Sequence, residues 1–367
     1  MRKEEAMEAS TMDDFRSFKT ARREQAAPMK PLIDPAGWTA DELRDVSRWS
    51  YRINASDADE LAAAVAAVRR NGIAMVDVRK EDFPLAAFAD VLADVRRELL
   101  DGRGIVMMKD FPLDRFDREG AAIAYIGLGA HLGQTMSQNK LGHILGHVKD
   151  LGGDYSDPNT RGYMTNAEMR FHTDACDYVG LVCLQTPQSG GASRIASSVT
   201  VYNTMLERRP ELVEALCGDY YRSRSGEISP GDLPYFAQPI FSFHEGYFSA
   251  TGVGAVIDKA QKLPGVPKFT PVQKEAVEVY RQTVDEIALD IDFQRGDIQF
   301  LNNFVMLHTR REYHDWPEAD RKRHLLRLWL YDAAGRPIPK AQREGRFGRG
   351  VSVKGVQRVA PLEAEAA

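Results

Sequence analysis

The spacing of apolar residues changes near residue 170, and this change constrains the fold more than any other feature of the chain. Before it, the segments 57–72 and 84–102 place apolar residues three and four apart, as amphipathic helices do. The segment "TADELRDVSRW" opens with Thr39 followed by Glu42, the pattern of a capping box. After residue 170, short apolar segments alternate with Gly, Pro and Asp, which indicates strands joined by turns.

Helices followed by many short strands favour a sandwich or jelly roll with helical cover. The segments 207–218 and 270–287 are expected to add two helices among the strands, the second capped by Thr270. Earlier in the chain, 84–102 is expected to begin its helix at Pro84, 104–111 to form a strand and 118–133 to form a further helix. The early helices must bury their apolar faces against the strands. We therefore expect one domain over residues 31–340, a mobile arm over 1–30 and a tail over 341–367.

Composition narrows the class of protein. Hydrophobic residues make up 43% and charged residues 28% of the 367 residues, as in globular proteins with a sizeable core. The net charge is −5 with both signs interspersed, which argues against a nucleic-acid partner. The apolar runs are shorter than the roughly 18 residues that a membrane span needs. Three cysteines without a C-x-x-C pattern favour a reduced, cytoplasmic location, and oligomeric state stays open.

The stretch "FHTDACDYVG" places His172 and Asp174 two residues apart, just before an apolar run. With 8 histidines and 53 acidic residues in the chain, such a triplet also arises by chance, and a capped turn is the alternative interpretation. A third ligand is sought in "GDIQFLNNFVMLH", which ends at His308. Two histidines and one carboxylate suit non-haem Fe(II) and leave coordination positions open. The closest rival to His308 is His314, which lies in a segment typical of a solvated loop.

Two arginines follow His308, at positions 323 and 327. Arg327 interrupts the apolar segment "HLLRLWLYD", where an unpaired charge would be expensive to bury. A guanidinium matches a carboxylate in bidentate fashion, so an anionic partner is expected. Arg323 stands in "DRKRH" and has a surface charge as its alternative interpretation.

The ordered set "FHTD", "SGGASRIASS", "GDIQFLNNFVMLH" and "RHLLRLWL" resembles the taurine dioxygenase-like (TauD/TfdA) family of Fe(II)- and 2-oxoglutarate-dependent oxygenases, over roughly residues 100–335. The resemblance implies a double-stranded β-helix, a jelly roll of the clavaminate synthase type. It implies that iron is held by His172, Asp174 and His308. It also implies that Arg323 binds the distal carboxylate of 2-oxoglutarate with help from Ser193, where family members often have Thr. Arg327 matches a second family arginine, near the cosubstrate or an anionic substrate group, and the division of roles between the two arginines stays open.

The family chemistry turns 2-oxoglutarate and O₂ into succinate and CO₂ while a C–H bond of a small molecule is oxidised. Asp174 stands where related halogenases have a small residue, so hydroxylation, or a related desaturation or cyclisation, is implied. The expected substrate is amino-acid-like or another polar carboxylated metabolite. Side chains expected near it are Asn139, Tyr163, Thr165, Asn166 and Asn303. Each of these could equally satisfy backbone groups in loops.

Two other functions use the same ligands. A cupin-like metal-binding protein without oxygenase activity would have no need of Arg323 or Arg327. A zinc hydrolase would work without O₂, but no Glu lies between paired histidines to act as its base. His143 and His147 have a spacing that can hold zinc on a helix. The glycines beside them weaken a helix there, so we interpret both histidines as structural or pocket-lining.

Overall fold

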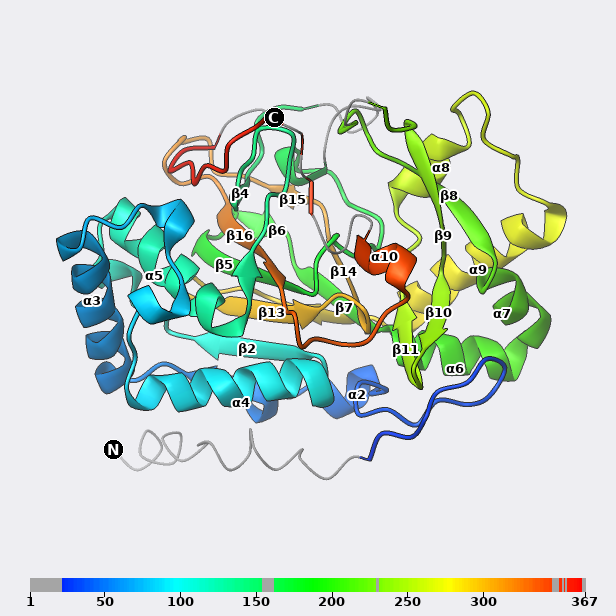
Figure 1. The fold of residues 1–367 in the computed structure, drawn as a ribbon, viewed down its shortest axis with the longest axis horizontal. Helices are drawn as coiled ribbons and strands as arrows, with labels where there is room; N and C mark the ends of the chain where they lie inside the picture. The colour runs from blue at the N-terminus through cyan, green and yellow to red at the C-terminus, as the bar shows by residue number, and fades with distance from the viewer. Residues whose placement is uncertain are drawn as a thin grey trace.

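The largest sheet of the protein separates a layer of helices from a second, smaller sheet (Figure 1). The computed structural model describes residues 22–153, 162–228, 231–344, 350–351, 353 and 355–364. The large sheet runs in the order β1, β2, β13, β5, β16, β3, with β4 also paired to β16. Only β1 and β2 pair in parallel, and the other neighbours are antiparallel. The bounds are β1 (Ser50–Arg52), β2 (Ile105–Lys109), β3 (Gln134–Thr135), β4 (Leu145–Val148), β5 (Tyr178–Gln185), β13 (Ile298–Asn302) and β16 (His324–Tyr331).

Each face of the large sheet belongs to a different apolar core. On β16, Leu326, Leu328 and Leu330 join the core beneath the helices. Leu325 and Trp329 join the core between the two sheets. Successive side chains of a strand point to opposite faces, so one strand contributes to both cores.

The helical layer consists of α3 (Ala55–Arg70), α4 (Ala87–Asp101) and α5 (Arg118–Leu132). Side chains cap two of these helices: Asn54 accepts from the Asp57 amide, and Asp117 accepts from the Gly120 amide. The expected start of α4 at Pro84 is wrong, because helical geometry begins only at Ala87. Of the elements expected over the first part of the chain, α3, α5 and strand β2 are confirmed.

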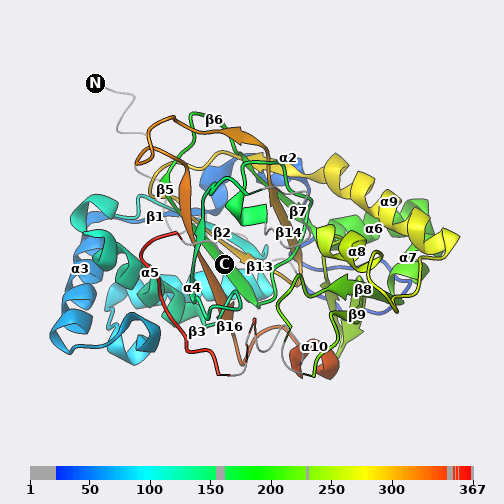
Figure 2. The ribbon, with the colours of Figure 1, turned by 90° about the horizontal axis from the view of Figure 1, so that it is seen from above.

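The smaller sheet is built from β12 (Leu289–Ile291), β7 (Ser193–Ser197) and β14 (Met306–Arg310), all antiparallel. Helices α6 (Ser198–Arg208), α7 (Pro210–Leu216) and α9 (Pro271–Ile287) pack together at this end of the molecule (Figure 2). Thr270 caps α9 as expected. Helix α6 was not predicted, because its β-branched and aromatic residues favour strands and only burial of one face stabilises it as a helix.

A third group of elements lies beside the smaller sheet. It comprises the hairpins β8 (Asp219–Ser223) with β9 (Tyr235–Pro239) and β10 (Phe241–His244) with β11 (Tyr247–Ala250), together with α8 (Ala255–Ala260). The remaining elements are α2 (Ala40–Leu43), α10 (Lys340–Glu344), the β6 (Ser189–Gly190) and β15 (Tyr313–His314) pair, and short 3-10 helices at Val46–Trp49, Met75–Asp77, Lys80–Asp82, Leu113–Arg115 and Gly162–Met164.

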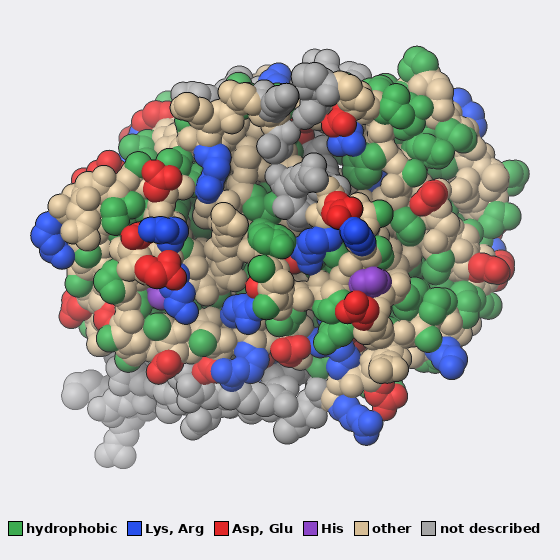
Figure 3. All heavy atoms as spheres, in the orientation of Figure 1, with side chains coloured by type: hydrophobic (Ala, Val, Ile, Leu, Met, Phe, Trp, Pro, Cys, Tyr) green, Lys and Arg blue, Asp and Glu red, His purple; other side chains and the backbone are tan. Residues whose placement is uncertain are grey.

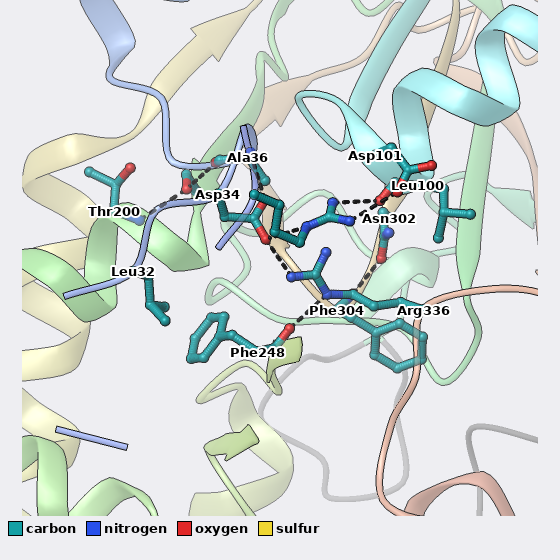
Figure 4. Close-up of polar contacts among 12 residues, drawn as sticks. Leu32, Asp34, Ala36, Leu100, Asp101, Thr200, Phe248, Asn302, Phe304 and Arg336 are labelled. Carbon is teal, nitrogen blue, oxygen red and sulfur yellow. Dashed lines mark hydrogen bonds and ion pairs between the residues drawn. The ribbon is translucent and has the colours of Figure 1, made fainter. Parts of the chain in front are cut away.

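Asp34 fastens the N-terminal segment to the rest of the chain (Figure 4). Its carboxylate accepts from Arg23 Nε at 3.0 Å and from Arg336 Nη2 at 2.6 Å, and Arg336 also donates to the Phe248 carbonyl. Burial would raise the pKa of Asp34, but the two guanidinium groups lower it below its ordinary value. Most of the expected N-terminal arm, residues 1–21, lies outside the described residues. Within the described part, the Ala26 amide donates to the Gly246 carbonyl at 2.7 Å.

The surface shown in Figure 3 carries basic and acidic side chains interspersed with one another. Within the described parts of the chain, every helix is too short or too polar to cross a bilayer.

Candidate metal centre

His172, Asp174 and His308 meet between the two sheets. His308 lies on β14, and His172 forms a two-way backbone bridge with it, with N···O distances of 3.0 and 3.1 Å. Asp174 follows two residues later, before β5 begins at Tyr178. One ligand atom from each of the three side chains lies within 4.8 Å of the other two. The structure therefore brings together the three ligands that the sequence suggested, and they match the donor set that suits a non-haem iron.

Hydrogen bonding and burial prepare the two imidazoles differently. His172 Nδ1 lies 2.9 Å from the Arg170 carbonyl, so this nitrogen donates its proton there and fixes the tautomer of the ring. Burial, reinforced by the neighbouring His172, lowers the pKa of His308 to about 3, so the His308 ring is neutral at ordinary pH. Its Nε2 lies 3.8 Å from Asp174 Oδ2. A neutral imidazole beside a carboxylate fits a metal site.

Asp174 is held as a carboxylate by its neighbours. Trp329 Nε1 donates to its Oδ2 at 2.8 Å, and Arg327 Nη1 lies 3.2 Å from the same oxygen. Burial would raise the pKa of Asp174, but Arg327 and the two histidines outweigh it and lower the pKa to about 2. A buried carboxylate that stays ionised is suited to a divalent cation.

Two residues behind the ligands were not found by sequence reasoning in this role. Asn303, expected near the substrate, is fully buried, and its Oδ1 accepts from the Asp174 amide at 3.0 Å. Gly252 packs directly on His172: a Cβ at this position would lie 2.6 Å from His172 Cα. Contacts of this kind leave no pattern in the sequence, because the partners are far apart along the chain.

Arg323 provides a buried cation beside Tyr313 and Gly191. Its side chain is 3% exposed, lies over the Tyr313 ring at 5.0 Å, and has an Nη1 without a hydrogen-bond partner among the described residues. Gly191 lies beside it, with φ +74°, and a Cβ there would be in ordinary contact with Arg323 Nε at 3.4 Å. The alternative of a surface charge is therefore wrong. A buried guanidinium with an N–H group that lacks a hydrogen-bond partner is stabilised when an anion binds to it.

Ser193 lies on β7, at 4% exposure, and its hydroxyl donates to Gln299 Oε1 at 3.2 Å. Gln299 stands on β13, in cross-strand register with Leu181, which in turn is opposite Arg327 on β16. Residues directly opposite across a sheet share a face, so Gln299 and Arg327 both point toward the space between the sheets.

A cavity of about 160 Å³ adjoins His172 and Asp174. Tyr163 and Arg327 line it, with the guanidinium carbon 5.1 Å from the centre of the tyrosine ring. The remaining lining comes mainly from β8, β9 and the 251–259 segment, which sequence reasoning did not connect with the site. It includes Arg222, Phe236, Gln238, Thr251 and Lys259.

The other expected substrate residues lie elsewhere. Asn139 Oδ1 accepts from the Leu141 and His143 amides, in the wall of a smaller cavity that also touches Arg327. Thr165 bonds to the Gly162 carbonyl, and Asn166 is exposed. None of these three side chains lines the cavity that adjoins His172 and Asp174.

His143 and His147 do not form a helical zinc pair. His147 belongs to strand β4, and its Nδ1 shares a hydrogen bond with His324 Nε2 at 2.8 Å. Both line the smaller cavity, in agreement with the structural or pocket-lining interpretation.

Solved structures with the same architecture define the class of protein. An asparagine oxygenase in complex with Fe(II), 2S,3S-3-hydroxyasparagine and succinate aligns with a TM-score of 0.61 at 17% identity, covering 77% of this chain and 93% of that one. The non-heme iron oxygenase OrfP, with Fe, succinate and (3S)-hydroxy-L-Arg, gives a TM-score of 0.59 at 14% identity, covering 85% and 99%. The fold is therefore that of these iron oxygenases.

Sequence comparison gives the family. FR-33289 synthase from Streptomyces rubellomurinus is 28% identical over 89% of this chain and 97% of its own length. The taurine hydroxylase-like protein SAT17 from Stachybotrys chartarum is 26% identical over 82% and 80%. The chain belongs to the taurine catabolism dioxygenase TauD, TfdA family, whose model matches residues 70–329. It is an Fe(II)- and 2-oxoglutarate-dependent dioxygenase.

Proposed function

We propose that His172, Asp174 and His308 hold Fe(II), and that Arg323 binds the distal carboxylate of 2-oxoglutarate. The observation that carries the proposal is the convergence of two imidazoles and one ionised carboxylate, whose ligand atoms lie within 4.8 Å of one another. The open Nη1 of buried Arg323 supports the second part. When bound, the iron with 2-oxoglutarate and O₂ supplies the oxidising power for attack on a C–H bond.

The protein's own residues position the ligands and exclude water. Trp329 orients Asp174 through its indole N–H, and the Arg170 carbonyl fixes the tautomer of His172. Arg327 Nε donates to Gln138 Oε1 at 2.8 Å, which holds the guanidinium at the cavity wall. Ser193 is proposed as a second contact for the cosubstrate, with Gln299 keeping its hydroxyl in place.

The likeness to the solved iron oxygenases also supports a more specific description of the fold. We infer that the two facing sheets form a double-stranded β-helix, a jelly roll, within one domain over residues 31–340. The shared core between the sheets supports this, because residues of β5, β7, β14 and β16 contribute to it.

The substrate is proposed to be a small polar, amino-acid-like or carboxylated molecule that is hydroxylated. The asparagine oxygenase structure holds a hydroxylated asparagine, and the OrfP structure holds a hydroxylated arginine. The cavity of about 160 Å³ has room for a molecule of that kind, and Arg327 lines it. All three cysteines are free thiols, which supports a working place in the cytoplasm.

The experiment is a visible spectrum of anaerobic metal-free protein titrated with Fe(II) and then 2-oxoglutarate. Wild type should show a weak charge-transfer band that needs both additions. His172→Ala should lose the band, and Arg323→Ala should need a much higher 2-oxoglutarate concentration. The matched control is Arg321→Ala, because Arg321 is half exposed and stacks on Trp316. A well-folded wild type that binds iron but shows no band would contradict the proposal.

A further inference from the structure

Arg222 is a buried arginine in the wall of the cavity that adjoins His172 and Asp174. It lies on β8 with 6% of its surface exposed, and it shares the cavity with His172, Asp174 and Arg327. Arg327 comes from the large sheet, whereas Arg222 comes from the β8–β9 hairpin, so the two guanidinium groups reach the cavity from different parts of the fold. Family comparison supplied no role for this residue.

The hydrogen bonds of Arg222 go to neutral acceptors. Nη1 donates to the Gly252 carbonyl at 2.8 Å, and Nη2 donates to Thr251 Oγ1 at 2.6 Å. Nε is buried without a hydrogen-bond partner among the described residues. Burial lowers the pKa of Arg222 to about 10, so the group remains a cation at neutral pH. A buried cation without a counter-ion is costly, which makes an absent anion the natural complement.

The charges around the cavity do not supply that anion. Asp174 is the one carboxylate among the described lining residues, and it pairs with Arg327. Arg170, also in the lining, lies 3.5 Å from Asp258. Within the described residues, Arg222 thus has no carboxylate partner in a cavity whose other basic groups include Arg327 and Lys259.

The hydrogen bond to Gly252 places Arg222 close to the metal ligands. Gly252 lies against His172, with a Cβ position 2.6 Å from its Cα, and the Gly252 amide donates to Thr173 Oγ1 at 3.2 Å. A group bound to Arg222 would therefore lie in the same small cavity as the face of the candidate centre that His172 presents.

We propose that Arg222 binds an acidic group of the substrate, and that the substrate is accordingly a small oxoacid held against the β8–β9 hairpin. The bond to be oxidised then lies between this anchor and the metal centre. This inference rests on the proposed function of the centre, and it adds a second anion-binding residue to Arg323. Carboxylate and sulfonate groups offer the same chemistry to a guanidinium, and the experiment separates them.

The probes are butyrate, propane-1-sulfonate and the uncharged butanamide, titrated by calorimetry into anaerobic protein saturated with Fe(II) and 2-oxoglutarate. We expect at least one acid to bind wild type and perturb the charge-transfer band, and butanamide to bind at least about tenfold more weakly. Arg222→Gln should weaken binding of the acid at least about tenfold while the band itself persists. Arg222→Lys should retain most of the affinity. Whichever acid binds more tightly identifies the preferred oxoanion.

Arg224→Gln is the matched control, because Arg224 lies two residues away, outside the cavity lining, and donates to the Leu233 carbonyl. Equal acid binding in wild type and Arg222→Gln, with the band intact, would overturn the proposal and leave Arg222 as a support for the 251–252 turn. If Arg222→Gln does not fold, acids that bind wild type no more tightly than butanamide would overturn it equally.

Failure of the proposed function gives a different result. It would appear as a missing band in wild type before any probe is added. Calorimetry on the metal-free protein then still compares wild type with Arg222→Gln, and acid binding that depends on Arg222 would support the anion site alone.

Discussion

Two pairs of histidine rings pack against each other in the described part of this protein, and only one pair is arranged to hold a metal. The rings of His172 and His308 are 4.5 Å apart, and those of His147 and His324 are 5.0 Å apart. In the second pair the ring nitrogens bond directly to each other at 2.8 Å. In the first pair both rings instead face Asp174, with His308 Nε2 3.8 Å from its Oδ2.

The difference lies in what satisfies the ring nitrogens. The second ring nitrogen of His147, Nε2, forms a hydrogen bond with the Pro361 carbonyl at 2.9 Å, so this pair holds the C-terminal segment against β4. Burial lowers the pKa of both His147 and His324, and among the described residues no carboxylate forms a hydrogen bond with either ring. Ring spacing alone therefore does not make a metal site. A carboxylate that faces both rings, as Asp174 does in the first pair, is also needed.

The largest effect should come from removing one ligand. His172→Ala should abolish iron binding and succinate formation, because two remaining donors hold the ion too weakly. His147→Ala should leave turnover close to wild type and lower only stability. Iron content and succinate release measured on both variants test the contrast. Equal loss of iron in the two variants would remove the distinction between the pairs.

Gly252→Ala should displace His172, the residue of the first pair on which Gly252 packs. Its Cβ would meet His172 Cα at 2.6 Å and Thr173 N at 2.9 Å, which are backbone atoms that cannot rotate away. We expect a large fall in iron affinity without a change at the second pair. Gly218→Ala is the control, because its nearest neighbour would lie 3.3 Å away. Normal iron titration of Gly252→Ala would show that the segment can shift freely.

Trp329→Phe tests the support of the carboxylate. It removes the N–H that bonds Asp174 at 2.8 Å and keeps an aromatic ring in the core. Loss of such an outer contact typically costs 10–100-fold in metal affinity or activity, so we expect about that range. Competition with a chelator measures it. An unchanged affinity would assign the orientation of Asp174 to Arg327 alone.

The prediction that leaves the metal centre unchanged concerns acid stability at the second pair. Burial and the neighbouring His147 lower the pKa of His324 to about 3 in the folded protein, against an ordinary value of about 6.5. Its contribution to stability is present above pH 6.5 and is lost as pH falls toward 3. Wild type should thus lose on the order of 2–3 kcal/mol relative to His324→Gln between pH 8 and pH 4.

Urea unfolding of metal-free protein across this range measures the difference. Exposed His314 gives the control variant His314→Gln, whose stability should run parallel to wild type. A difference between wild type and His324→Gln that does not change with pH would mean that His324 is not buried in its neutral form.

The amino-acid sequence carried much of the architecture. The capping residue Thr270 placed α9, which begins at Pro271, and short apolar segments between turns placed β2, β5, β13 and β16. It failed where tertiary packing overrides local preference. Pro84 was expected to open α4, and the β-branched residues of α6 hid a helix. Both errors concern boundaries or propensities that neighbouring elements decide.

The order of residues along the chain is enough to recognise the family: a His-x-Asp pair, a later histidine after an apolar strand, and two arginines. Those residues are recognisable because ligand chemistry demands particular side chains at short or ordered spacings. The surroundings of the centre become visible only in the folded chain, including Asn303 beneath Asp174, Gly252 against His172, and Arg222 in the cavity wall. These contacts join elements far apart in the chain, and packing imposes no fixed spacing on them.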